Sequence, residues 1–108
     1  MSRQPDIWRG PIRNMQNLVC SEFGLKLLNL TSHRRSKGVM AARHIAFWLC
    51  RHYTQASYPV IGQHFEGRDH TTIINGCQKA EDMMKRDPVL KRRVDKIIAI
   101  WAKHGDQE

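Results

Sequence analysis

Residues 57–86 read SYPVIGQHFEGRDHTTIINGCQKAEDMMKR, and this stretch decides the fold of the chain. Ser57 is a good N-cap and Pro59 lies in the turn that follows it, so a short helix is predicted over 58–65. The polar segment EGRD predicts a tight turn, after which Asp69 caps a longer helix that an Asp-Pro pair ends. A short helix, a turn containing glycine and a second helix form the outline of a helix-turn-helix.

The rest of the chain shows the same helical period, with apolar residues three or four positions apart. One helix is predicted from Pro11 to a stop at Gly24, a long one over about 37–53, and a last one over about 89–103. The apolar piece LKLLNL and the basic loop TSHRRSKG separate the first two. No stretch alternates with the period of a strand. The predicted fold class is therefore all-α: a compact bundle of five or six helices containing a helix-turn-helix, with a basic loop before the long central helix.

Apolar periodicity also predicts the core and the domain limits. The short helix is expected to bury Val60, Ile61 and Phe65, and the helix after the turn Ile73, Ile74, Cys77, Ala80 and Met84. A flexible arm is expected over 1–9, a single domain over 10–104 and a tail over 105–108. The odd number and wide spacing of Cys20, Cys50 and Cys77 argue against disulfides, so we expect buried thiols in a reducing compartment, the cytoplasm.

The charge of the chain is high and unevenly placed. Lys and Arg number 18 against 10 Asp and Glu, and no acidic residue occurs between Phe23 and Phe65. A basic face on a small domain favours a polyanionic partner, namely DNA, RNA or an anionic membrane surface, although a merely solvated basic surface is the alternative. No apolar run is long enough to span a membrane, no signal peptide is visible, and no CxxC or HxxxH spacing suggests a metal or cofactor.

The residues at the start of the second helix point to nucleic acid. Asp69, His70, Thr71 and Thr72 stand where a recognition helix presents its N-terminal end to base edges. Asp69 suits cytosine N4, His70 suits purine N7, guanine O6 or thymine O4, and the threonines suit the thymine methyl group. A purely structural role for Asp69 as an N-cap is an equal alternative.

The segment SHRRSKGVMAARHIAFWLCRHYTQASYPVIGQHFEGRDHTTIINGCQKAE closely resembles the C-terminal DNA-binding domain of DnaA, the bacterial chromosomal replication initiator. The resemblance runs from about Asn14 to Trp101. It rests on the GRDHTT hexapeptide, the upstream RRS loop, the helix containing Ala-Arg, and the Ile-Gly pair ten residues before Thr71.

This resemblance implies an all-helical domain that binds duplex DNA at short A·T-rich boxes of the TTATNCACA type. Asp69, His70, Thr71 and Thr72 would read the major groove, and Arg35 would enter the neighbouring minor groove. Tyr58 and Pro59 match positions that pack against thymine methyl groups. The expected phosphate contacts are the basic residues Arg34, Lys37, Arg43, Arg51, Arg68 and Lys79.

The chain also departs from this family. It has no GxxxxGK[ST] motif and no room for the motor domain, so nucleotide binding, ATP hydrolysis and origin melting are not carried over. Glu66 stands where the family usually has glycine, and His44 where glutamine is expected. Because the chain begins with Met, we take it as a natural short protein.

The leading hypothesis is a sequence-specific DNA-binding protein, cytoplasmic and nucleoid-associated, that regulates replication initiation or transcription or competes with the full-length initiator at its boxes. The alternative is a protein-interaction module that docks on the initiator or another partner, for which Trp48 and Trp101 are candidate contacts; core packing is favoured for Trp101. Catalysis is not expected, because Asp69 and His70 are helix neighbours without an accompanying nucleophile. RNA binding is disfavoured because a helix-turn-helix suits the DNA major groove.

Overall fold

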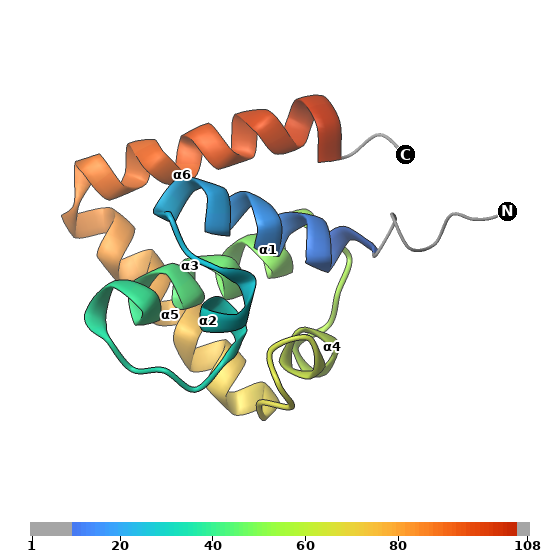
Figure 1. Ribbon diagram of the computed structural model, residues 1–108. Coiled ribbons are helices and arrows are strands. Elements are labelled where there is room, and N and C mark those ends of the chain that lie inside the picture. Colours follow the sequence, from blue (N-terminus) through green and yellow to red (C-terminus); the bar gives the residue numbers. More distant parts are fainter. Residues whose placement is uncertain (1–9, 106–108) are drawn as a thin grey trace, which may run out of the picture.

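The computed structural model describes residues 10–105, and these fold entirely into helices and connecting loops. The helices are α1 (Gly10–Phe23), α2 (Leu27–Thr31), α3 (Lys37–Tyr53), α4 (Tyr58–Gln63), α5 (His70–Arg86) and α6 (Pro88–Ile100), with the π-helical turn η1 (Trp101–Gly105) at the end (Figure 1). This confirms the all-α fold class. The arm predicted for 1–9 and residues 106–108 of the predicted tail lie outside the described residues.

Local sequence signals determine where most helices begin and end. The left-handed backbone of Gly24, with a φ of 67°, ends α1, and the Asp87 carboxylate accepts hydrogen bonds from the amides of Val89 and Leu90 at the start of α6. Two details differ from the sequence prediction. The piece LKLLNL contains the short helix α2, and α4 ends at Gln63, so Phe65 is buried from the turn rather than from the helix.

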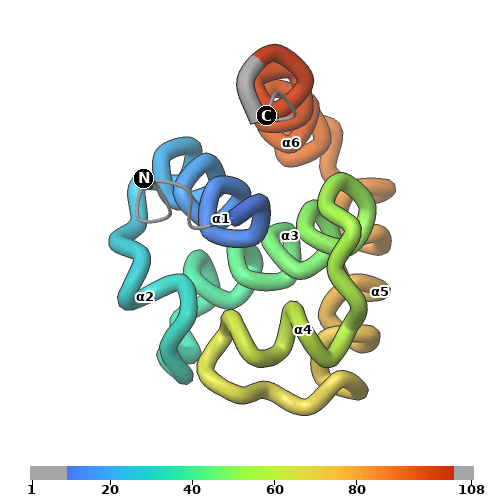
Figure 2. The backbone as a smooth tube through the Cα atoms, turned by 90° about the vertical axis from the view of Figure 1, so that its right-hand side faces the viewer, coloured from blue at the N-terminus to red at the C-terminus, as the bar shows by residue number. Residues whose placement is uncertain are grey.

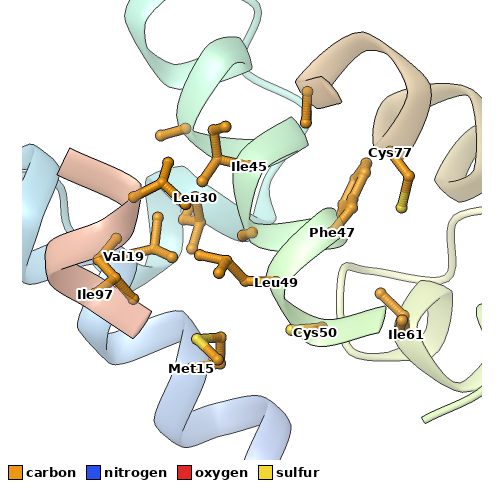
Figure 3. Packing of buried hydrophobic residues seen from close by; sticks show 14 of the residues in the cluster. Met15, Val19, Leu30, Ile45, Phe47, Leu49, Cys50, Ile61, Cys77 and Ile97 are labelled. Atoms are coloured by element: carbon orange, nitrogen blue, oxygen red, sulfur yellow. The ribbon is translucent and has the colours of Figure 1, made fainter. Parts of the chain in front are cut away.

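Helix α3 lies in the centre of the bundle. It packs against α5, α1, α2 and α4, and α6 lies across α1 and α5 (Figures 1 and 2). Figure 3 shows the fully buried α3 side chains in the middle of the core, with residues of other helices on both sides. A Cβ at Gly76 of α5 would collide with the Phe47 ring, so this glycine lets α3 and α5 approach closely.

Several predictions for the core are confirmed and some are wrong. Cys20, Cys50 and Cys77 are buried free thiols, and burial raises the pKa of Cys77 to about 11. Trp101 is buried, as expected, with 6% of its surface exposed. However, Val60 and Ile74, predicted to be buried, are 40% and 41% exposed.

An ion-pair group joins the first and last helices. The Glu22 carboxylate of α1 accepts a hydrogen bond from Arg93 Nε at 3.2 Å and lies 3.3 Å from Lys96 Nζ, both on α6. Burial alone would raise the pKa of Glu22, but hydrogen bonds from these two cations outweigh it and lower the pKa. Among residues 10–105, no helix is both long and apolar enough to cross a bilayer.

Candidate nucleic-acid interface

The helix-turn-helix predicted from the sequence is formed by α4, the turn 64–69 and α5. Ser57 Oγ accepts a hydrogen bond from the Val60 amide at 3.3 Å, and Asp69 Oδ2 accepts one from the Thr71 amide at 2.9 Å. Both predicted N-caps are therefore confirmed. The hydrogen bond from Thr71 lowers the pKa of Asp69, so its side chain is a carboxylate at neutral pH.

The turn folds back on α4 through left-handed backbone and a close approach. Glu66 and Gly67 have φ values of 61° and 71°, which reverse the chain within two residues. The Arg68 amide then donates a hydrogen bond to the Gly62 carbonyl at 3.0 Å. A Cβ at Gly62 would collide with the Arg68 carbonyl oxygen. The glycine of the Ile-Gly pair is therefore needed because the backbone of the turn passes close to it.

The side chains predicted to read bases lie exposed at the start of α5. Asp69, His70, Thr71 and Thr72 all face solvent, whereas the next residue, Ile73, is fully buried. His70 Nδ1 lies 3.6 Å from Asp69 Oδ1, which is closer than expected for helix neighbours. The reason is that Asp69 is the N-cap and has extended backbone, so the two residues do not follow helical geometry. This end of α5 therefore offers a carboxylate, an imidazole and two hydroxyl groups to a ligand.

The basic loop between α2 and α3 is the second exposed element. The residues that face solvent there are His33, Arg34, Arg35, Ser36 and Lys37. The Arg34 amide donates a hydrogen bond to Ser32 Oγ at 3.2 Å, which fixes the start of the loop. Two arginines and a lysine thus stand at the N-terminal end of the central helix.

The structure brings the basic loop and the start of α5 together. Arg68 Nη1 and Nη2 donate hydrogen bonds to the carbonyls of Thr31 and Ser32 at 2.8 and 2.6 Å, and His33 Nε2 lies 3.8 Å from Glu66 Oε1. The loop and the turn lie at the bottom of the molecule in Figures 1 and 2. The start of the basic loop and the turn that precedes α5 therefore lie against each other, although more than thirty residues separate them in sequence.

Arg43, predicted to contact phosphate, is buried with 4% of its surface exposed. Its Nε donates to the Leu30 carbonyl at 2.8 Å and its Nη2 to the Asn29 carbonyl at 3.1 Å. Burial and the neighbouring Arg68 guanidinium lower its pKa. Its guanidinium therefore already has partners within the protein, and the phosphate contact stays a prediction.

Arg51 and Tyr58 contact each other at the start of the helix-turn-helix. The Arg51 guanidinium lies 4.3 Å from the centre of the Tyr58 ring, and its Nη1 donates to the Ala56 carbonyl at 3.1 Å. Tyr58 is half-buried while Pro59 beside it is exposed. Pro59 is therefore accessible to a ligand, whereas the Arg51 guanidinium covers part of the Tyr58 ring.

Lys79 and His44 lie at a groove between α3 and α5. The groove has a volume of about 620 Å³, and Lys37, Met40 and Met83 also line it. Burial, together with nearby Lys79 and Arg43, lowers the pKa of His44 to about 4. His44 is therefore uncharged at neutral pH, so it resembles in charge the glutamine that was expected there.

Sequence reasoning missed three features of this surface. It did not find the contacts of Arg68 with α2, because backbone carbonyls have no residue-specific signature. It placed Ile74 in the core, whereas Ile74 is exposed one turn after Thr71. It also missed the burial of Arg43, although a signal was present: Arg43 lies four residues from both Val39 and Phe47 on the buried face of α3.

Within the part of the chain that the structure describes, no three His, Cys, Asp or Glu side chains gather in a way that could hold a metal ion. Neither reading element contains such a group. The exposed side chains of the two elements are hydrogen-bonding groups at the start of α5 and cations in the basic loop.

Comparison with known proteins agrees with this geometry. Residues 12–80 match the family described as the bacterial dnaA protein helix-turn-helix. The chain is 44% identical over 89 residues to the chromosomal replication initiator protein DnaA of Pelobacter propionicus, and 40% identical over 86 residues to that of Geobacter sulfurreducens. The DnaA of Mycoplasma capricolum is 37% identical over 84 residues. These alignments cover 82%, 80% and 78% of the chain but only 20%, 19% and 19% of the relatives, so the chain spans about a fifth of their length.

Proposed function

Because the chain belongs to the family of the bacterial DnaA helix-turn-helix, we propose that it binds duplex DNA at short A·T-rich boxes of the TTATNCACA type. The observation that carries this proposal is the group of exposed polar side chains at the start of α5, held beside an exposed basic loop. A helix-turn-helix places the N-terminal end of its second helix in the major groove. In this chain that end carries Asp69, His70, Thr71 and Thr72.

Each of these side chains has a base edge that suits its chemistry. His70 suits purine N7, guanine O6 or thymine O4 as a hydrogen-bond donor, and the threonine methyl groups pack on thymine methyl groups. Asp69 combines its cap role with base reading. Its Oδ2 accepts the Thr71 amide, and a carboxylate has further lone pairs with which Oδ1 can accept from cytosine N4.

The basic loop supplies the second part of the recognition. Arg35 enters the minor groove beside the box, where a narrow A·T-rich groove has an enhanced negative potential. Arg34 and Lys37, on either side of it, contact phosphates, as do Arg51 and Lys79 from the helices. Phosphate contacts of this kind fix the register of the protein on DNA and make its affinity depend on salt.

The proposed function needs no nucleotide. The chain binds its boxes without ATP, in the cytoplasm on nucleoid DNA, and competes there with the full-length initiator or regulates replication initiation or transcription at such sites. Docking on the initiator, with only weak and non-specific DNA binding, is the contrasting hypothesis. The two hypotheses differ in whether the chain prefers a box over other DNA.

The test is a fluorescence-anisotropy titration of a TTATCCACA duplex and of a scrambled duplex of equal composition, at low and near-physiological salt. We expect a preference of about 10³-fold or more for the box. Variants His70→Ala and Thr71→Ala should each lose about 1–3 kcal/mol of that preference. Gln78→Ala, two turns further along α5 and also exposed, is the matched control and should keep it. Equal weakening of both duplexes by His70→Ala would refute the assignment of reading residues.

A further inference from the structure

The C-terminal end of α2 is held by two arginines from other parts of the chain. The last carbonyls of a helix have no partner within it and must be satisfied elsewhere. At the end of α2, the Arg43 guanidinium donates hydrogen bonds to the carbonyls of Asn29 and Leu30. The Arg68 guanidinium donates to those of Thr31 and of the C-cap Ser32. Four consecutive carbonyls therefore accept hydrogen bonds from two guanidinium groups, at the helix end that favours positive charge.

Arg68 holds the helix-turn-helix and the basic loop at the same time. Its Nη1 donates to the Phe65 carbonyl at 2.7 Å within the turn, and its Nη2 lies 3.5 Å from His33 Nδ1, near the start of the loop. Through its main chain it is the residue directly before the N-cap Asp69. A displacement of the end of α2, from which the loop starts, relative to the turn before α5 must therefore break hydrogen bonds of this one side chain.

We propose that Arg43 and Arg68 are positioning residues, which hold the basic loop at a fixed distance from the start of α5 so that the minor-groove and major-groove readers engage one box together. This inference rests on the proposed function. It differs from the sequence prediction, in which both arginines contact phosphate. We call the pair, together with the four carbonyls of residues 29–32, the arginine clamp.

Two properties of the clamp favour positioning over phosphate contact. Arg43 is almost completely buried and Arg68 is half-buried, and both direct their donors inwards, onto carbonyl oxygens. Apart from the clamp, the described contacts of the loop are local or lie at its two ends. Ser32 Oγ donates to the Asn29 carbonyl and accepts from the Arg34 amide, the Ser36 carbonyl accepts from the Met40 amide, and His33 lies beside Glu66. Binding to DNA with an unplaced loop would require ordering it at that moment, and preorganisation removes this cost.

A double-mutant cycle between Arg68 and Arg35 tests the clamp. We measure the affinity of the wild type, Arg35→Ala, Arg68→Lys and both together for the box and for the scrambled duplex. Lysine keeps the charge but cannot reach several carbonyls in the planar geometry of a guanidinium. We expect Arg68→Lys to weaken box binding about tenfold or more while leaving the scrambled duplex nearly unchanged. Arg35→Ala should then have a much smaller effect in the Arg68→Lys background, because Arg35 is no longer held at its groove.

The dependence of affinity on salt separates positioning from phosphate contact. Each phosphate contact contributes about 0.9 to the slope of log affinity against log salt. On the scrambled duplex, Arg68→Met should leave the steepness of that slope nearly unchanged. Lys37, an exposed lysine at the start of α3, provides the matched control, because Lys37→Met should reduce the steepness by about 0.9.

Three results would overturn the inference. One is that the effects of the Arg68 and Arg35 substitutions on box affinity simply add, although the wild type prefers the box. Another is that Arg68→Met reduces the salt dependence of affinity for the scrambled duplex as much as Lys37→Met does. The third is loss of the helical circular-dichroism signal in both Arg68 variants, because Arg68 would then hold the whole fold rather than the loop. A wild type without box preference refutes the proposed function itself, and the clamp then has nothing to position.

Discussion

Replacing Glu66 by glycine should stabilise the fold. Glu66 has a φ of 61°, a left-handed conformation that costs an L-residue about 1–2 kcal/mol. Glycine avoids this cost but loses about 0.5–1 kcal/mol more in chain entropy on folding. The exposed pair with His33, 3.8 Å apart, contributes about 0.3 kcal/mol. The sum is a gain of about 0.5 kcal/mol in the free energy of unfolding, which corresponds to about 2–4 °C in Tm for a domain of this size.

Urea and thermal unfolding followed by circular dichroism provide the assay, and Glu66→Gln provides the control. Glutamine removes the charge that faces His33 but keeps the left-handed backbone, so it should be about 0.3 kcal/mol less stable than the wild type. The difference between the two variants, about 0.8 kcal/mol, isolates the backbone. A glycine variant no more stable than the glutamine variant would show that the turn carries no such strain.

Four further substitutions test the fold. Gly62→Ala should lower the free energy of unfolding by about 1–3 kcal/mol, because its Cβ would collide with the Arg68 carbonyl, whereas Gly38→Ala, in open space on α3, should raise it by about 0.5–1 kcal/mol. Glu22→Gln should cost about 1 kcal/mol in urea melts at pH 7. Because the folded pKa of Glu22 is lowered, this difference should be lost as the pH falls below its ordinary value of 4.5. The pKa of His44 is about 4 in the folded protein and 6.5 ordinarily, so the unfolded chain binds a proton first as the pH falls. The wild type should therefore lose stability relative to His44→Gln as the pH falls from 6.5 to 4. Parallel stability profiles of the two proteins against pH would contradict this.

Local signals predicted most of the fold because they act within one turn of a helix. Ser57 and Asp69 cap the helices they were expected to cap, and the Asp-Pro pair at 87–88 separates α5 from α6. Helix α2 was not predicted because it has only five residues and no side-chain cap, and its C-terminal end depends on arginines far away in sequence. Its formation is a tertiary effect.

Burial was harder to predict where a helix meets the core at an edge. Ile74 was assigned to the buried face together with Ile73. However, side chains at adjacent positions of a helix point in directions that differ by about a quarter of a turn. Ile73 points at the core and Ile74 away from its centre. Arg43 shows the opposite case, because the resemblance assigned it to phosphate although its side chain lies on the buried face of α3.

Glu66 lies in the strained turn and acts electrostatically on both arginines of the clamp, and this links the two sets of measurements. Glu66 is the carboxylate whose charge acts on both Arg43 and Arg68 and raises their pKa values against the effect of burial. Removing it relieves the backbone but leaves two neighbouring cations without that counter-charge. We expect the clamp to persist, because its hydrogen bonds go to backbone carbonyls that no substitution at Glu66 removes. Glu66→Gly should therefore tighten the box and the scrambled duplex by the same small factor, and a fall in box preference would mean that Glu66 helps to hold the loop in place.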